Sequence, residues 1–403
     1  MGAYAVVMTP SPFSRRRFLS LSAVGATALL ASRHVRAETA QPLPKTVAVL
    51  RNGMERGLHI GAQLYVSREG RPVAEVAIGE AKPGVKMTPD TLMTWYSSTK
   101  PLTSLCVGQC WERGKLQLDD PVAKHVPEFG RHGKDRVTIR HVLTHTSGFP
   151  RADLDVRFKR PWPDVIAAIC DAKLEDGWEV GRHAQYHPTS GMYMLGEIVS
   201  RVSGMPFERY IRRELFEPLG MKDSWVGMPL ETYRNYGDRL GTMVNTDTGT
   251  VVPAEHYSGI GQHGWATQCV PGGNGHGPMR ELGRFYEMMG NGGTLNGKRV
   301  LATKTVEEFT RVHRPDSPTY GGKQPAAPWG LGISRQRAVG GAHCSPKTFG
   351  HGGSLSSLAF CDPAHRLVVA FVCNGRPKQP DHAARTREIA AAVYEDLGLA
   401  KKA

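Results

Sequence analysis

The stretch from Thr94 to Ser104 constrains the chain most, because it places a serine three residues before a lysine at the expected start of a helix. Residues three apart in a helical turn lie on one face, so Ser97 and Lys100 can touch. A serine hydroxyl becomes a nucleophile only when a base takes its proton, and a helix N-terminus favours the resulting negative charge. The spacing also fits a plain helix start, with Ser97 as the cap and Lys100 solvated.

The length and composition indicate a globular chain. Its 403 residues are enough for one large domain or two intimate ones. The hydrophobic fraction of 40% and the charged fraction of 22% argue against a disordered, fibrous or coiled-coil protein. The basic residues are scattered and no nucleic-acid motif is present, so we expect no nucleic-acid partner.

Residues 1–37 have the features of an export signal. Arg15, Arg16 and Arg17 precede an apolar run, and small residues stand before a cleavage point after Ala37. This pattern predicts a twin-arginine signal peptide and an exported mature chain, 38–403, in the periplasm or outside the cell. An uncleaved anchor and a misplaced start codon are the alternatives.

The apolar run of this segment is too short and too rich in Ala, Ser and Gly for a convincing membrane span. We therefore expect no stable membrane span after cleavage. The segment carries five arginines and no acid, so +9 of the total charge of +14 belongs to the rest of the chain. This excess fits an anionic ligand or, more simply, a solvated basic surface.

Neither the cysteines nor the histidines predict a metal site. The seven cysteines have neither a zinc spacing nor the density of a disulfide framework, and we expect Cys106 and Cys110 to be small buried residues. His141 and His145 have the i, i+4 spacing of metal ligands on a helix, but the glutamate of H-E-x-x-H is absent. The glycine-rich stretch 272–277 lacks the lysine of a phosphate loop. We expect no metal and no cofactor.

Strand patterns gather near the two ends of the chain. A hairpin is predicted over residues 60–78, a glycine-rich approach over 349–354, strands over 358–361 and 367–373, and a terminal helix over 383–397. The sequence therefore predicts an α/β (α+β) fold, an antiparallel sheet flanked by helices. A mostly helical subdomain is inserted, roughly over 115–340. Helices are expected over 98–113, 137–148, 162–170, 207–215, 281–289 and 305–312, and within 186–203 after a turn. The polar segment 226–278 is a candidate lid or rim.

Three further stretches follow the serine–lysine pair in order: the run Ile139–Gly148, Tyr186 with the glycines after it, and His351-Gly352-Gly353. With these motifs the chain resembles the serine β-lactamase-like family of class C β-lactamases, D-alanyl-D-alanine carboxypeptidases and family VIII esterases. The resemblance extends from about residue 45 to 398 and includes the stretches 121–127, 217–221 and 290–293.

The resemblance implies a role for each matched residue. Ser97 matches the acylated nucleophile, and Lys100 matches the lysine that shares or removes its proton. Tyr186 matches the tyrosine that acts as base or acid with that lysine; the alternative is a tyrosine that only packs beside the helix. The backbone amides of Ser97 and Ser354 would form the oxyanion hole.

The sequence departs from the family pattern at two motifs. His351 stands where many relatives have the lysine of Lys-Thr-Gly, so the expected cation is at best a titrating imidazole; it could orient the substrate or simply cap the strand. Tyr186 is followed by His187 and Pro188, and a proline supplies no amide, although Thr189 or Ser190 could sit nearby. Both departures favour neutral esters over substrates with a carboxylate.

The sequence thus predicts a serine hydrolase that forms an acyl-enzyme through a Ser-Lys-Tyr set and acts on carboxylic esters or small amides. A cell-wall D-Ala-D-Ala carboxypeptidase or weak β-lactamase is the second hypothesis. A non-catalytic exported binding protein of the same fold is the third. The expected partner is a small-molecule ester or amide, and the oligomeric state stays open.

Overall fold

The computed structural model describes residues 43–401, apart from residue 154 and the segments 156–159, 253–263, 323–324 and 337–338. The signal peptide predicted over residues 1–37 and part of the proposed lid therefore lie outside the described residues. No helix within the described part of the chain has the length and apolar character that crossing a membrane requires.

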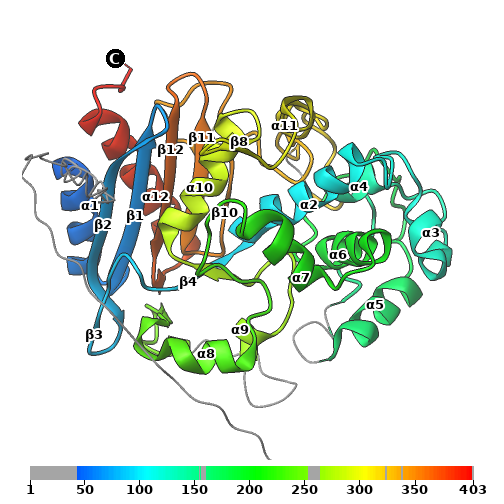
Figure 1. Ribbon diagram of the computed structural model, residues 1–403, viewed down its shortest axis with the longest axis horizontal. Coiled ribbons are helices and arrows are strands. Elements are labelled where there is room, and N and C mark those ends of the chain that lie inside the picture. The colour runs from blue at the N-terminus through cyan, green and yellow to red at the C-terminus, as the bar shows by residue number, and fades with distance from the viewer. Residues whose placement is uncertain are drawn as a thin grey trace, which may run out of the picture. The chain divides into compact units, whose positions relative to one another are not determined.

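A six-stranded antiparallel sheet joins the two ends of the chain, as predicted (Figure 1). The strand order is β10-β11-β12-β1-β2-β3. Strand β1 pairs with β12 in a register that places Leu64 opposite Phe371. The strands are β1 (Gly61–Arg68), β2 (Arg71–Lys82), β3 (Val85–Lys86), β10 (Phe349–Gly352), β11 (Ser357–Asp362) and β12 (Leu367–Cys373).

Helices cover both faces of this sheet. Alternate residues of β12 point to opposite sides, so Val369 and Phe371 pack with the apolar residues of α1 (Pro44–Glu55) and α12 (Gln379–Asp396). Val368, Ala370 and Val372 lie in the other core cluster, with α10 (Met279–Gly290). Because both faces are buried, the strand reads as a continuous apolar run.

The chain between β3 and β10 is mainly helical. Helix α2 (Lys100–Glu112) is buried from Lys100 to Cys110 and packs against α6 (Ser190–Ser203), so Cys106 and Cys110 are buried as expected. The remaining elements are β4 (Met93–Tyr96), η1 (Ser97–Thr99), α3 (Val122–His125), η2 (Pro127–Gly130), α4 (Ile139–Leu143), α5 (Trp162–Asp171), α7 (Phe207–Ile211), η3 (Arg212–Phe216), α8 (Leu230–Tyr236), η4 (Gly237–Arg239), β5 (Met243–Asn245), β6 (Val251–Val252), α9 (Gly264–Thr267), β7 (Gly275–Gly277), β8 (Thr294–Leu295), β9 (Lys298–Arg299), α11 (Thr303–Thr310) and β13 (Gly375–Arg376).

The helix predicted over 137–148 is shorter than expected. Helix α4 ends at Leu143, and His145 has a φ of 59°, which a right-handed helix excludes. The Nδ1 atom of His141 accepts a hydrogen bond from the Thr138 backbone, whereas that of His145 accepts one from the His187 backbone. The two histidines therefore do not share a helix face, and the prediction of a helix that continues through His145 was wrong.

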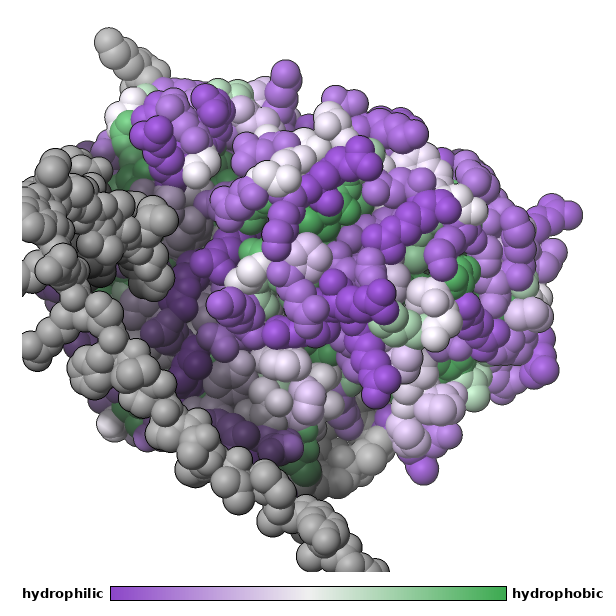
Figure 2. Space-filling view, in the orientation of Figure 1, coloured by the Kyte–Doolittle hydropathy of each residue, from purple (hydrophilic) through white to green (hydrophobic). Residues whose placement is uncertain are grey.

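Polar residues predominate on the face shown in Figure 2, and apolar residues appear there in small separate patches. Large exposed hydrophobic residues of the described chain include Tyr186 and Val312. A tyrosine presents an apolar ring together with a polar hydroxyl, which suits a position at the edge of a site. Tyr186 is therefore of interest for the site.

Candidate active site

The predicted nucleophile stands at a sharp junction between a strand and a helix. Strand β4 ends at Tyr96, whose φ of 46° is rare for a residue with a side chain. The Thr99 hydroxyl holds this turn: it donates to the Tyr96 carbonyl at 2.6 Å and accepts from the Gly275 amide at 2.8 Å. The turn directs the chain into η1, which begins at Ser97 and leads into α2 at Lys100.

Lys100 contacts Ser97 as the helical spacing predicts. Its Nζ atom donates to Ser97 Oγ at 2.9 Å and to the Gly272 carbonyl at 2.7 Å, and the lysine is fully buried. A Cβ atom at Gly272 would lie 2.5 Å from Met192 Cγ, so a side chain at this position would disturb the close approach. The Gly272 carbonyl therefore fixes the ammonium beside the serine.

Tyr186 is the third member of the predicted set and lies with the other two. Its ring centroid is 4.9 Å from Lys100 Nζ. Although 39% of the whole residue is exposed, its hydroxyl interacts with Ser97. Burial of this hydroxyl raises the pKa of Tyr186, and the hydrogen bond with Ser97 opposes the rise only in part. At neutral pH the phenol is protonated.

The histidine after Tyr186 supports the loop. His187 is buried; its Nδ1 donates to the Gln185 carbonyl at 2.7 Å, and its Nε2 accepts from the Phe149 amide at 3.2 Å. Burial lowers the pKa of His187 to about 4, so the ring is neutral. The Ser190 hydroxyl donates to the Phe149 carbonyl. These hydrogen bonds fix the loop that carries Tyr186.

The third motif lies on β10, directly beside the nucleophile. Ser98 Oγ donates to the His351 carbonyl at 2.9 Å, which ties β10 to the turn that carries Ser97. His351 Nδ1 donates to the Gly352 carbonyl at 2.6 Å. Burial, and next the charge of Lys100, lower the pKa of His351 to about 3. The imidazole is therefore neutral and does not replace the lysine cation of related sequences.

The glycine that ends this motif allows β10 to approach β4. A Cβ atom at Gly353 would lie 2.2 Å from the Trp95 carbonyl oxygen and 3.1 Å from Tyr96 Cβ. The peptide between Gly353 and Ser354 consequently lies beside the turn that carries Ser97. The oxyanion hole expected from the amides of Ser97 and Ser354 stays a prediction.

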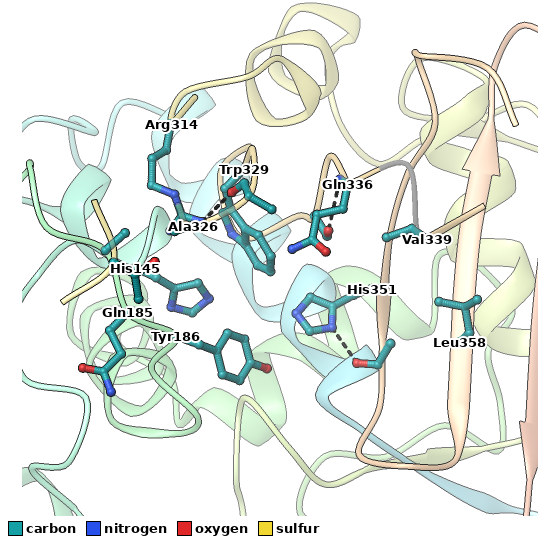
Figure 3. A pocket seen from close by; sticks show the side chains of 15 residues that line it. His145, Gln185, Tyr186, Arg314, Ala326, Trp329, Gln336, Val339, His351 and Leu358 are labelled. Atoms are coloured by element: carbon teal, nitrogen blue, oxygen red, sulfur yellow. Dashed lines mark hydrogen bonds between the residues drawn. The ribbon is translucent and has the colours of Figure 1, made fainter. Parts of the chain in front are cut away.

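A cavity of about 520 Å³ opens beside Tyr186 and His351 (Figure 3). His145, Arg314 and Trp329 also line it, and these three side chains are at least nine-tenths buried. The His145 ring is 4.8 Å from the Tyr186 ring and 5.1 Å from the Trp329 ring, measured between centroids. The site thus consists of the reactive set and an adjoining aromatic cavity.

Part of this site could not be predicted from the sequence. Gly272 lies in a stretch considered as a phosphate loop and within a candidate lid, and Trp329 and Arg314 lie in a stretch without an assigned element. His145 was considered as a metal ligand and within a family-like stretch, and Ser98 only as the start of a helix. No local pattern identifies such residues, because their contacts cross more than a hundred residues of sequence.

The sheet, the inserted helices and the Ser97–Lys100 pair define a chain with the fold of β-lactamases and transpeptidases. It belongs to the β-lactamase family, whose sequence pattern matches residues 47–394. The resemblance inferred from the motifs is confirmed. Members of this family are serine hydrolases, among them esterases, carboxypeptidases and amidases.

A putative D-alanyl-D-alanine carboxypeptidase of Salmonella enteritidis PT4 is 26% identical over 381 residues, which cover 84% of each chain. Two solved structures are similar at comparable identity. A penicillin-binding protein homolog from Caulobacter crescentus has a TM-score of 0.75 and 26% identity, covering 89% of this chain and 98% of its own. A family VIII carboxylesterase has a TM-score of 0.74 and 25% identity, covering 89% and 99%.

Proposed function

We propose that this protein hydrolyses carboxylic esters or small amides through an acyl-enzyme on Ser97. The observation that carries the proposal is the position of Lys100 Nζ, 2.9 Å from Ser97 Oγ, with the Tyr186 ring 4.9 Å from the same nitrogen. A nucleophile and a proton acceptor within hydrogen-bond distance are what such catalysis requires. A binding protein of the same fold would need none of these contacts.

In the proposed reaction Lys100, as the neutral amine, and the protonated Tyr186 form the proton-transfer pair. Ser97 Oγ attacks the carbonyl carbon while its proton passes to Lys100 Nζ. The pair then returns a proton to the leaving oxygen or nitrogen, and the bond to the leaving group breaks. A water molecule attacks the acyl-enzyme by the same route and releases the acid. The protonated phenol of Tyr186 suits it to the step in which the leaving group gains its proton.

The neutral third motif supports esters as the preferred substrates. His351 carries no charge at neutral pH, and the residues that line the cavity include no carboxylate. The guanidinium of Arg314 also lines it, but its two terminal nitrogens donate to the carbonyl oxygens of Thr144 and Ala327. Within the described lining of this cavity a substrate carboxylate therefore lacks a dedicated cation, whereas a neutral ester needs none. A cation near Ser354 is Arg376, whose Nη2 lies 3.4 Å from Ser354 Oγ.

A cell-wall D-Ala-D-Ala carboxypeptidase or a weak β-lactamase is the second candidate. The printed names of the curated relative and of the penicillin-binding protein homolog favour it. The neutral imidazole of His351 argues against it, because these substrates carry a carboxylate beside the bond that breaks. The family VIII carboxylesterase of similar identity supports the ester instead.

The test compares kcat/KM for p-nitrophenyl butyrate, benzylpenicillin and a peptide ending in D-Ala-D-Ala, with Ser97→Ala as the control. We expect the ester to exceed the other two by about 30- to 150-fold, since the loss of one charge-assisted contact costs about 2–3 kcal/mol. Comparable turnover of the ester and either of the others would contradict the preference for esters.

A further inference from the structure

Three polar ring atoms face the cavity beside Tyr186 without a hydrogen-bond partner in the described part of the chain. They are His145 Nε2, Trp329 Nε1 and His351 Nε2, and each residue is at most 5% exposed. Buried polar atoms are nearly always paired, because an unpaired one has lost its water without compensation. Because three such atoms belong to residues that line one cavity, we infer that a group of the ligand forms the missing hydrogen bonds.

The hydrogen bonds of the Nδ1 atoms of His145 and His351 determine whether the Nε2 atom of each ring donates or accepts. His145 Nδ1 accepts from the His187 amide at 3.3 Å, so its proton is on Nε2. His351 Nδ1 donates to the Gly352 carbonyl, so its Nε2 carries a lone pair. Trp329 Nε1 can only donate. The three ring atoms therefore supply two donors and one acceptor, and Arg314 Nε, also without a partner in the described part of the chain, is a further donor of the cavity lining. Both imidazoles are neutral because burial lowers their pKa.

The three rings are neighbours. The Trp329 ring centroid lies 5.1 Å from that of His145 and 5.5 Å from that of His351. In Figure 3 the free nitrogen of His351 lies on the side of its ring that faces His145 and Tyr186. Two donors and one acceptor on neighbouring rings complement the hydrogen-bonding groups of a hydroxyl, which has two lone pairs and one proton.

The position of Tyr186 indicates which part of the substrate enters the cavity. Its phenol is the group that gives a proton to the leaving oxygen, and the same ring lines the cavity. The leaving alcohol consequently extends toward the three rings. The acyl chain is attached to the other side of the carbonyl carbon.

We propose that this cavity is a subsite for a hydroxyl group on the leaving alcohol, so that the preferred substrates are esters of diols or polyols. The inference rests on the proposed function. The alcohol hydroxyl accepts from His145 Nε2 and Trp329 Nε1 and donates to His351 Nε2. Trp329 is thus a specificity-determining residue that does not take part in the proton transfers.

The experiment compares 2-hydroxyethyl butyrate with propyl butyrate, which replaces the hydroxyl by a methyl group of similar size. Acid release gives kcat/KM for the wild type, for Trp329→Phe and for the control Trp162→Phe. The Trp162 indole donates to Glu197 on α6 and lies outside the cavity. We expect the wild type and the control to prefer the hydroxyethyl ester by about tenfold or more, and Trp329→Phe to lose most of this preference.

Covalent labelling by a fluorophosphonate distinguishes failure of the hydroxyl subsite from failure of the proposed function. Labelled wild-type protein that hydrolyses both esters equally would overturn the hydroxyl subsite alone, as expected if the cavity holds only water. A Trp329→Phe variant that is labelled yet keeps the full preference would also overturn it. Preference for carboxymethyl butyrate would assign the cavity to an anion instead. Absence of both labelling and ester hydrolysis would overturn the proposed function and this inference with it.

Discussion

Tyr186 connects the reactive pair to the cavity. Its ring lies over Lys100 on one side and contacts the His145 ring on another, and its hydroxyl interacts with Ser97. Removal of the hydroxyl alone would leave the ring contacts in place. The chemical role of this residue can therefore be separated from its packing.

For Tyr186→Phe we predict a decrease in kcat of about 10²–10⁴-fold, because the leaving group loses its proton donor. KM and the melting temperature should change little, since the ring still packs. Steady-state hydrolysis of propyl butyrate, whose alkoxide leaving group needs a proton, and thermal unfolding measure the two effects. The matched control is Tyr320→Phe, whose hydroxyl donates to the Asp176 carbonyl at 2.6 Å. A Tyr186→Phe variant with the wild-type kcat would refute the role given to the phenol.

The reactive pair could be predicted from the sequence because its geometry is local. Three residues of a helical turn are enough to place Lys100 on Ser97. The environment of the pair could not be predicted in this way. Gly272 and Trp329 reach the site from segments 172 and 229 residues beyond Lys100, and only the tertiary fold brings them there.

At the scale of elements, the site depends on how strand β10 joins the turn η1. Ser98 points away from the substrate side; its hydroxyl donates to the His351 carbonyl and lies 3.0 Å from Ser357 Oγ. Ser357 Oγ in turn donates to the Trp95 carbonyl at 2.7 Å. The two consecutive serines thus have different contacts: Ser97 contacts Lys100, and Ser98 connects η1 to β10.

The Ser98→Ala substitution should lower the free energy of unfolding by about 1–3 kcal/mol, because it leaves a buried carbonyl without its donor. Chemical denaturation measures this change. The neighbouring Ser97→Ala is the matched control and should lose less stability, because Lys100 Nζ keeps the Gly272 carbonyl as an acceptor. Labelling should show the reverse pattern, with Ser98→Ala still modified by a fluorophosphonate. Equal stabilities of the two variants would contradict the connection described here.

The elements themselves were predictable to different degrees. Alternating and apolar runs identified the strands at both ends of the chain, because their side chains face two cores. The helix expected over 137–148 was too long, since the periodicity of its residues does not reveal that His145 takes a positive φ. Such a conformation depends on tertiary contacts, here the hydrogen bond from the His187 amide.

At the scale of the whole molecule, the described chain buries several neutral histidines. Burial is the main cause that lowers the pKa of these side chains from 6.5, to about 3 for His59 and His351 and to about 4 for His187, His276 and His382. The unfolded chain binds a proton at each position near pH 6.5, whereas the folded chain does not until pH 3–4. Acid therefore favours the unfolded state across this interval.

We predict that the melting temperature decreases as the pH falls from 7 to 5, by about 5 °C or more. Each histidine of this group contributes up to about 1.4 kcal/mol for each pH unit below 6.5. The lowered pKa values of Asp120 and Asp362, about 2, act in the same direction only at lower pH, near and below 4. Differential scanning calorimetry measures the change. A melting temperature that is equal at pH 5 and pH 7 would refute this account of the buried histidines.

The central claim is that Ser97 is the nucleophile, and the intact mass of the protein after exposure to a fluorophosphonate tests it most directly. We predict one adduct on the wild type and on Ser98→Ala, and none on Ser97→Ala. Because Lys100 Nζ is 2.9 Å from Ser97 Oγ, that hydroxyl is the one prepared for attack. Equal labelling of Ser97→Ala and the wild type would place the nucleophile elsewhere and contradict the mechanism.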